Sequence, residues 1–257
     1  MIGAENMSIR TPMNKTEGKC ILIGAGDLTI SGIPVGEEDL CIAVDGGFSY
    51  CKLLGIEPHY VLGDFDSLGM GMVGSDGSET MEETDASEEF VALKKRNTPE
   101  EELAEYERIH PGRVIRIPKE KDDTDMLAAL RLGLERGYRS FHLYGGSGGR
   151  LEHTIANIQC LLYLKEQGAT GYMMDGTGMI LVAKEEAVSF QESLEGYLSL
   201  FSLGEKAEVS IERMKYPLDH YEVTNSFPIG ISNEFIGEKG CITVHKGAVV
   251  IIISWVE

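Results

Sequence analysis

Short apolar runs that each end in small or acidic residues limit the fold of this chain more than any other feature. Three of them are KCILIGAGD (19–27), DLCIAVDGG (39–47) and HYVLGDFDS (59–67). Each has the length of a buried strand that leads into a tight turn. GRVIRIP (112–118) and SFHLYGGSGGR (140–150) continue the series, and the second of these ends in a glycine loop.

Helical patterns alternate with these runs. They are FSYCKLLG, closed by Gly55, then PEEELAEYERIH (99–110), DDTDMLAALRLGLERG (122–137) and LEHTIANIQCLLYLKEQG (151–168). Alternating strands and helices favour a parallel sheet with helices on both faces. We therefore expect a flexible leader over 1–18 and a three-layer α/β/α domain over 19–169.

The pattern of apolar and polar residues changes after about residue 170. Short alternating segments such as GYLSLFSLG, AEVSIERM and GCITVHKG follow one another, separated by turn residues and without a long helical pattern. This pattern is typical of an antiparallel β-sandwich or barrel, which we expect over 170–257. The acidic stretch 69–90, rich in Met, Gly and Ser, looks like a mobile insertion, either a flap or a surface loop; we favour the loop.

Composition narrows the function classes. The net charge of −19 over 257 residues disfavours a nucleic acid partner, because such proteins usually present a basic face. No apolar stretch approaches the length of a membrane span, and the first residues lack the basic start and apolar centre of a secretory signal. We expect a cytoplasmic protein without a membrane partner. The five scattered cysteines, with no CxxC pair, fit buried thiols in a reducing compartment.

Acidic residues follow two of the predicted strands. Asp45 closes one strand and is followed by Gly46 and Gly47, which allow a close backbone approach to a ligand and leave room for a phosphate. Asp64 and Asp66 follow another strand, and they would point to the same side if the backbone were extended there. A hard cation such as Mg²⁺ would relieve their repulsion, although a solvated turn is the alternative.

The run KDDTD opens a predicted helix. One of its carboxylates, at Asp122, Asp123 or Asp125, could complete a magnesium site, while the helix start offers backbone amides to a phosphate. Thr124 is equally suited to cap the helix, and Lys121 is either a phosphate contact or an ordinary surface lysine.

The glycine loop GGSGGR is the second candidate for phosphate binding. Gly148 and Gly149 make it flexible, and Arg150 can hold a phosphate through its forked guanidinium. Glu152 and His153 follow at once and are candidate substrate contacts, although a lone histidine is often structural. The spacing matches neither a Walker loop nor a dinucleotide fingerprint.

Taken in order, VDGG, GDFDS, KDDTD, GGRLEHT and the ISNEF of the β-rich tail resemble the thiamine pyrophosphokinase family, from about residue 20 to the C-terminus. The resemblance implies transfer of a pyrophosphoryl group from ATP to the hydroxyl of thiamine, giving thiamine diphosphate and AMP, with Mg²⁺ required. It also implies a homodimer whose β domain binds the thiamine ring near the dimer interface.

The same resemblance implies roles for particular residues. The metal ligands would be Asp45, Asp64, Asp66 and Asp122. Nucleotide contacts would come from Gly46, Gly47, Lys121, Thr124, Gly148 and Gly149. Asp125 would orient or deprotonate the hydroxyl, and Arg150, Glu152 and His153 would assist catalysis. Ser232 and Asn233 would bind thiamine.

Two departures from the family pattern keep other functions open. Glu152 stands where the family commonly has Asp, and the segment between GDFDS and KDDTD is longer than in bacterial members. A pyrophosphokinase for another hydroxymethyl heterocycle, such as a pterin, is one alternative. A thiamine or nucleotide sensor without catalysis is another. A DxD-type phosphatase ranks lower, because its usual N-terminal DxDx[TV] motif is absent.

Overall fold

The computed structural model of the chain describes residues 7–9, 18–65, 98–118 and 123–255. Three of the predicted site residues, Asp66, Lys121 and Asp122, lie outside these ranges, and so does the predicted insertion 69–90.

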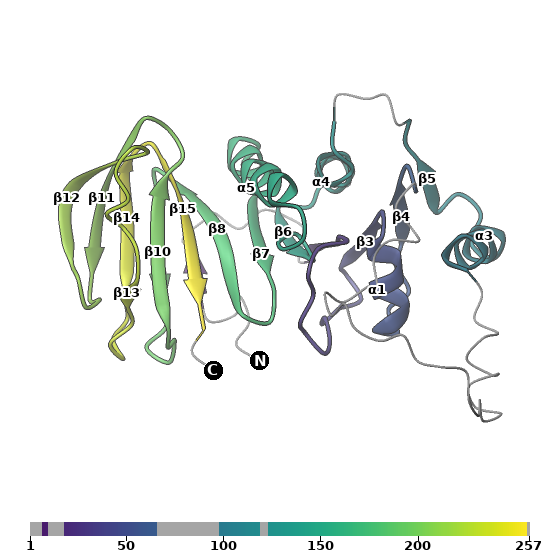
Figure 1. Ribbon diagram of the computed structural model, residues 1–257, viewed down its shortest axis with the longest axis horizontal. Coiled ribbons are helices and arrows are strands. Elements are labelled where there is room, and N and C mark those ends of the chain that lie inside the picture. Colours follow the sequence, from purple (N-terminus) through teal and green to yellow (C-terminus); the bar gives the residue numbers. More distant parts are fainter. Residues whose placement is uncertain (1–6, 10–17, 66–97, 119–122, 256–257) are drawn as a thin grey trace, which may run out of the picture.

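Six parallel strands form the larger part of a ten-stranded sheet (Figure 1). They are β2 (Cys20–Ile23), β3 (Leu40–Val44), β4 (Tyr60–Gly63), β5 (Val114–Arg116), β6 (Ser140–Tyr144) and β7 (Thr170–Met174). Their spatial order is β7-β6-β2-β3-β4-β5, and every neighbouring pair is parallel. Strands β3, β4 and β5 follow one another on one side of β2, and β6 and β7 then lie on its other side.

Among the described residues, four helices cover this parallel part of the sheet. They are α1 (Gly47–Leu53), α3 (Pro99–Ile109), α4 (Asp125–Glu135) and α5 (Leu151–Glu166). The acidic start of α3 carries a capping box in which Thr98 and Glu101 bond each other's backbone N–H. Among the described helices, none combines the length and apolar character that crossing a membrane requires.

Alternation along the strands explains the three layers. Cys20 and Leu22 of β2 pack with residues of α4 and α5, whereas Ile21 and Ile23 pack with residues of α1 and α3. Since both faces of the strand are fully buried, β2 reads in sequence as a continuous apolar run.

The C-terminal part forms an antiparallel sandwich. Strands β8 (Gly178–Lys184), β15 (Ala248–Ser254), β10 (Tyr197–Ser202) and β13 (Asn233–Glu234) extend the parallel sheet beyond β7. A second sheet has the order β1-β9-β14-β11-β12. Its strands are β1 (Met7–Ile9), β9 (Ala187–Phe190), β14 (Cys241–Lys246), β11 (Lys206–Glu212) and β12 (Leu218–Thr224). Its apolar face packs on the face of the large sheet that also carries α1 and α3.

The expected fold class, an α/β/α domain followed by an antiparallel β domain, is confirmed, and the β part is a sandwich. Three details differ from the sequence expectation. Residues 7–9 of the expected flexible leader pair with β9, so the leader is not loose throughout. Residues 170–174, expected in the antiparallel part, form the parallel strand β7. The large sheet then runs on without a break from β7 to β8, so the two parts share a sheet.

Candidate active site

The carboxyl ends of the parallel strands form one edge of the sheet, and several of the predicted site residues follow these ends. The loops after β2 and β6 lie beside each other where the strand order restarts, which is where ligands bind in open α/β sheets. The Gly26 and Asp27 amides donate to the carbonyls of Gly145 and Ser147, each at 2.8 Å. The two loops are therefore fastened together at this point.

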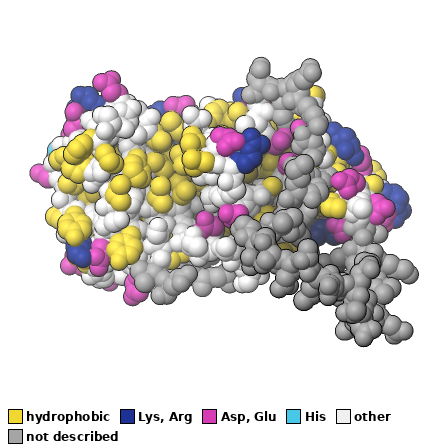
Figure 2. Space-filling view, in the orientation of Figure 1, with side chains coloured by type: hydrophobic (Ala, Val, Ile, Leu, Met, Phe, Trp, Pro, Cys, Tyr) yellow, Lys and Arg dark blue, Asp and Glu magenta, His cyan; other side chains and the backbone are white. Residues whose placement is uncertain are grey.

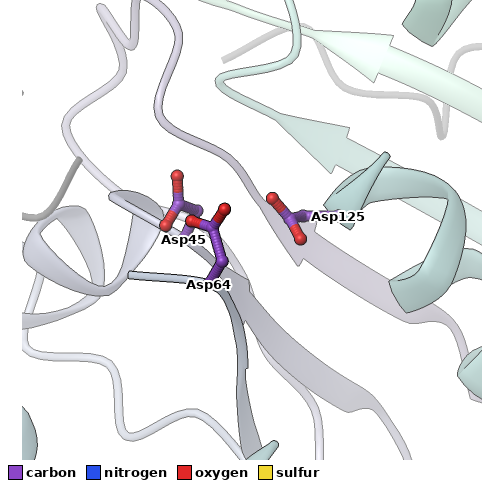
Figure 3. Close-up of side chains that lie close together, drawn as sticks. All are labelled: Asp45, Asp64 and Asp125. Atoms are coloured by element: carbon purple, nitrogen blue, oxygen red, sulfur yellow. The ribbon is translucent and has the colours of Figure 1, made fainter. Parts of the chain in front are cut away.

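Among the described residues, three aspartates meet at this edge (Figure 3). Asp45 follows β3, Asp64 follows β4, and Asp125 is the first residue of α4. Each offers a carboxylate oxygen, and the three oxygens lie within 4.8 Å of one another. All three side chains are half-buried. Their carboxylates point toward a common space, although the residues are as far as 80 positions apart in the chain.

Local sequence explains how these carboxylates come together. Asp45 adopts a left-handed backbone with φ of 52°, and its amide donates to the carbonyl of Leu62 at 2.8 Å. Gly63 leaves room for it, because a Cβ there would lie 3.1 Å from Asp45 Oδ1. Phe65 also has a positive φ of 61°, and its ring packs against the guanidinium of Arg116. The backbone after Asp64 is thus not extended. Sequence analysis expected Asp64 and Asp66 to point to the same side only if it were extended there.

This donor set fits a hard divalent cation. Mg²⁺ prefers oxygen ligands and commonly takes one or two protein carboxylates while keeping water or phosphate oxygens in its shell. Three carboxylates this close repel one another, and a cation between them would offset that repulsion. The family resemblance implies a role for Asp125 at the hydroxyl, and the structure brings its carboxylate to those of Asp45 and Asp64.

The predicted nucleotide contacts that the structure describes lie at the same edge, and several have a structural role. Gly47 begins α1 so close to β2 that a Cβ would lie 1.8 Å from the carbonyl of Ile23. A Cβ at Gly46 would approach the side chain of Ala25 to 3.0 Å. Thr124 caps α4, with Oγ1 accepting the Leu127 amide at 3.2 Å, as the alternative reading of its role had it.

Positive φ angles shape the glycine loop after β6. Gly148 has φ of 82° and Gly149 has φ of 60°, a region that side chains rarely adopt. A Cβ at Gly148 would lie 2.1 Å from Asp27 Oδ2, so this glycine is also needed for packing between the two loops. At Gly149 the same Cβ would meet open space.

Arg150 and Glu152 form an ion pair at the start of α5. Nε and a terminal nitrogen of Arg150 both lie 2.7 Å from Glu152 Oε1. A backbone N–H and the Arg150 guanidinium lower the pKa of the Glu152 carboxyl below its ordinary value. Both side chains are largely exposed, as is His153 next to them, so all three are accessible to a ligand.

The β domain holds Ser232 and Asn233 in different ways. Ser232 is exposed with a positive φ of 57°, and its amide donates to Ser199 Oγ at 3.1 Å. Asn233 is buried, and its side-chain amide is bonded to both backbone groups of Tyr216, at 3.0 and 2.8 Å. Asn233 thereby fixes the segment that carries exposed Tyr216, while Ser232 is the residue of this pair that a ligand can reach.

Three further residues around the glycine loop were missed from the sequence. The buried amide of Asn157 donates to the carbonyl of Gly146 at 2.7 Å, and Ser147 Oγ donates to Asp175 Oδ2 at 3.0 Å. A polar residue within the apolar stripe of α5 was the available signal for Asn157. For Asp175, the signal was an apolar run ending in Asp-Gly, the same pattern that marked Asp45.

Comparison with known proteins identifies the family. Residues 97–173 match the model described as "Thiamin pyrophosphokinase, catalytic domain", and residues 180–249 match "Thiamin pyrophosphokinase, vitamin B1 binding domain". Together these matches cover more than half of the chain. The chain belongs to the thiamine pyrophosphokinase family.

Relatives of this family agree over nearly the whole chain. Thiamine pyrophosphokinase of Bacillus subtilis is 26% identical over 220 residues, which span 85% of this chain and 88% of the relative. The crystal structure of the thiamine pyrophosphokinase from Bacillus subtilis superposes with a TM-score of 0.72 at 24% identity, covering 93% of this chain and 99% of that one. The yeast thiamin pyrophosphokinase structure has a TM-score of 0.58 at 17% identity, covering 99% and 94%. These two structures support the shared fold.

Proposed function

We propose that this protein is a thiamine pyrophosphokinase that transfers the pyrophosphoryl group of ATP to the hydroxyl of thiamine, giving thiamine diphosphate and AMP, with Mg²⁺ required. One observation carries the catalytic part of the proposal. Three carboxylates converge at the carboxyl edge of the sheet, between helix α4 and the ends of β3 and β4. The two family matches, one catalytic and one for vitamin B1 binding, supply the substrate.

In this reaction the thiamine hydroxyl oxygen attacks the β-phosphorus of ATP in line, the bond from that phosphorus to the α–β bridging oxygen breaks, and AMP leaves. Positioning and charge neutralisation supply most of the rate in phosphoryl transfer. Mg²⁺ held by Asp45, Asp64 and Asp125 would neutralise phosphate charge. Asp66 and Asp122 stay as proposed further ligands.

Asp125 is better suited to the metal than to proton removal. Its oxygen lies within 4.8 Å of the carboxylate oxygens of Asp45 and Asp64, and a carboxylate that shares a cation is a weaker base. The hydroxyl proton would then leave to solvent or to another group near the glycine loop. Gly148, Gly149 and Arg150 are the proposed phosphate contacts, with Lys121 and Thr124 at the start of α4.

Arg150 would have to exchange partners on binding. Two of its nitrogens lie against Glu152, so a phosphate would replace or share this contact. Glu152, with the exposed His153 beside it, would keep the guanidinium close to the loop until the nucleotide arrives.

We further propose that the protein works as a homodimer in the cytoplasm. Exposed hydrophobic side chains gather on the β domain, on the left in Figure 2. They include Tyr197, Tyr216, Phe227, Ile229, Ile231 and Ile236, which belong to or adjoin the segment carrying Ser232. Apolar surface of this kind is typical of an interface, which supports a thiamine site near a partner subunit.

The proposal is tested by incubating the purified protein with ATP, Mg²⁺ and thiamine, with product detection by mass spectrometry. We expect thiamine diphosphate and AMP in equal amounts, and neither product without Mg²⁺. A parallel reaction with a hydroxymethyl pterin is the control, and the vitamin B1 binding match at 180–249 predicts no transfer to it. Unchanged ATP and thiamine would refute the proposed function.

A further inference from the structure

Backbone hydrogen bonds hold the glycine loop after β6 from the β2 side. The carbonyls of Gly145 and Ser147 accept the amides of Gly26 and Asp27. Gly148 packs directly over the side chain of Asp27. These backbone bonds fix the distance between the two loops. The loop also contains three glycines with positive φ, and glycine permits many backbone conformations, so the bonds to the β2 side do not fix the conformation of the loop itself.

Side chains hold the loop from its other sides. Asn157 of α5, which is 8% exposed, bonds the carbonyl of Gly146 from the helix. Asp175, in the turn between β7 and β8, accepts a hydrogen bond from Ser147 Oγ at 3.0 Å. These side-chain bonds restrict the rotation that the glycines permit, because one ties Gly146 to helix α5 and the other ties Ser147 to the turn after β7.

Asp175 is itself rigidly held. Its Oδ1 accepts the amide of Thr177 at 2.7 Å, the hydroxyl of Thr177 at 2.7 Å and the amide of Gly178 at 2.9 Å. This leaves Oδ2 directed to Ser147. A carboxylate with four hydrogen-bond donors around it is oriented before any ligand binds, which suits it to positioning another group.

The turn that carries Asp175 also joins the two parts of the protein. The Gly176 amide donates to Thr29 Oγ1 at 2.9 Å, in the loop after β2. The Trp255 amide donates to the carbonyl of Thr177 at 2.9 Å, just past the end of β15. Strand β7 belongs to the parallel part of the sheet, while the region that matches the vitamin B1 binding model begins within β8, at residue 180. Asp175 therefore lies between the sandwich and the glycine loop.

We propose that Asp175 is a positioning residue for nucleotide binding, which acts through Ser147 to hold the glycine loop in the conformation that receives the phosphates. The inference rests on the proposed function and names a residue outside the predicted site. Asp175 does not contact the nucleotide itself, since a carboxylate would repel the phosphates. Loss of either partner of the Ser147–Asp175 bond loosens the loop in the same way.

The test measures the dissociation constant of α,β-methylene-ATP with Mg²⁺ by calorimetry. The variants are Ser147→Ala, Asp175→Ala and the double variant. We expect each single variant to bind about tenfold more weakly, a typical effect of losing a hydrogen bond to a charged group. The double variant should be no weaker than the weaker single variant, because both changes break one bond.

Thr177→Val is the matched control. It removes one hydrogen bond to Asp175 in the same turn but leaves the contact with Ser147, so its dissociation constant should stay within about twofold. In turnover assays, Ser147→Ala should raise KM for ATP about tenfold and leave KM for thiamine within about twofold. Ser147→Ala removes a single oxygen, so it is expected to fold even if Asp175→Ala does not.

Two results would overturn this inference but not the proposed function. In the first, the wild-type protein binds the analogue and Ser147→Ala leaves the dissociation constant unchanged. In the second, Thr177→Val weakens analogue binding as much as Ser147→Ala does. Failure of the wild-type protein to bind the analogue would instead overturn the proposed function, and this inference with it.

Discussion

Replacing Asp125 by Asn should make the metal-free protein more stable while removing its activity. The three carboxylate oxygens lie within 4.8 Å of one another. At that distance a pair of unit charges repels by about 1 kcal/mol in water and about 3 kcal/mol at an effective dielectric of 20. Because the half-buried side chains keep part of their hydration, we take the lower value, so removing the two pairs that involve Asp125 gains about 2 kcal/mol.

Part of this gain is offset at the helix. Asp125 is the only acidic residue in the first turn of α4, and a carboxylate there stabilises the helix by about 0.3–1 kcal/mol through its dipole. The net increase in the free energy of unfolding should be about 1 kcal/mol in EDTA. With Mg²⁺ at about 100 times its dissociation constant, the wild-type protein should gain about 2.7 kcal/mol, and Asp125→Asn much less. The order of stability should therefore reverse between EDTA and saturating Mg²⁺.

Urea denaturation followed by circular dichroism, in EDTA and in Mg²⁺, measures both free energies. Asp123→Asn is the matched control, because Asp123 pairs with Arg131 and lies just before the same helix. It should show no gain in EDTA and keep the Mg²⁺ effect. Equal stability of Asp125→Asn and wild type in EDTA, together with an undiminished Mg²⁺ effect, would refute the metal assignment.

Three further predictions concern other parts of the molecule. Burial and then the charge of Lys19 lower the pKa of His142 to about 4, so stability should fall as pH drops from about 6.5 to about 4, where only the unfolded chain takes up this proton. His142→Gln should remove about 3 kcal/mol of that loss in pH-dependent denaturation, and an identical pH profile would contradict it. Lys165 Nζ lies 2.6 Å from Glu186 Oε1, and both side chains are mostly buried. Lys165→Met should therefore lower the free energy of unfolding by about 3 kcal/mol, and adding Glu186→Gln should restore part of it. If urea denaturation shows that the two losses simply add in the double variant, the pair does not contribute in this way. Glu152→Asp should keep kcat/KM within about tenfold, because the Arg150 contact is exposed and adaptable, whereas a loss of several hundredfold would mean that the glutamate is specifically required.

The candidate site could be predicted in part from single residues at strand ends. Asp45 and Asp64 were identified because parallel strands end at one edge of a sheet, so an acidic residue after a buried run lies at that edge. Asp125 was recognised as a site residue, but its closeness to Asp45 and Asp64 was not predicted, because sequence does not reveal how far the start of α4 lies from β3 and β4. The structural reading of Thr124 as a helix cap was available beforehand, since its position before an apolar stripe is sufficient to predict it.

Residues that act through tertiary contacts could not be predicted from the sequence. Asn157 bonds the glycine loop from helix α5, which follows the loop, and Asp175 bonds it from the turn after β7. Strand β7 was missed because its five residues follow directly on α5 and resemble the β-rich tail. Its parallel pairing with β6 depends on the crossover of α5, which only the assembled sheet reveals.

The sequence by itself determined the alternation of strands and helices, the change to β structure after about residue 170, and the placement of acidic and glycine-rich motifs at strand ends. These features depend on local periodicity and turn chemistry, which neighbouring residues encode. Only the tertiary structure decided which three aspartates share a site and which side chains fix the glycine loop. It also joined the two parts through one continuous sheet. Such relations depend on strand order and on contacts between distant residues, which local patterns do not specify.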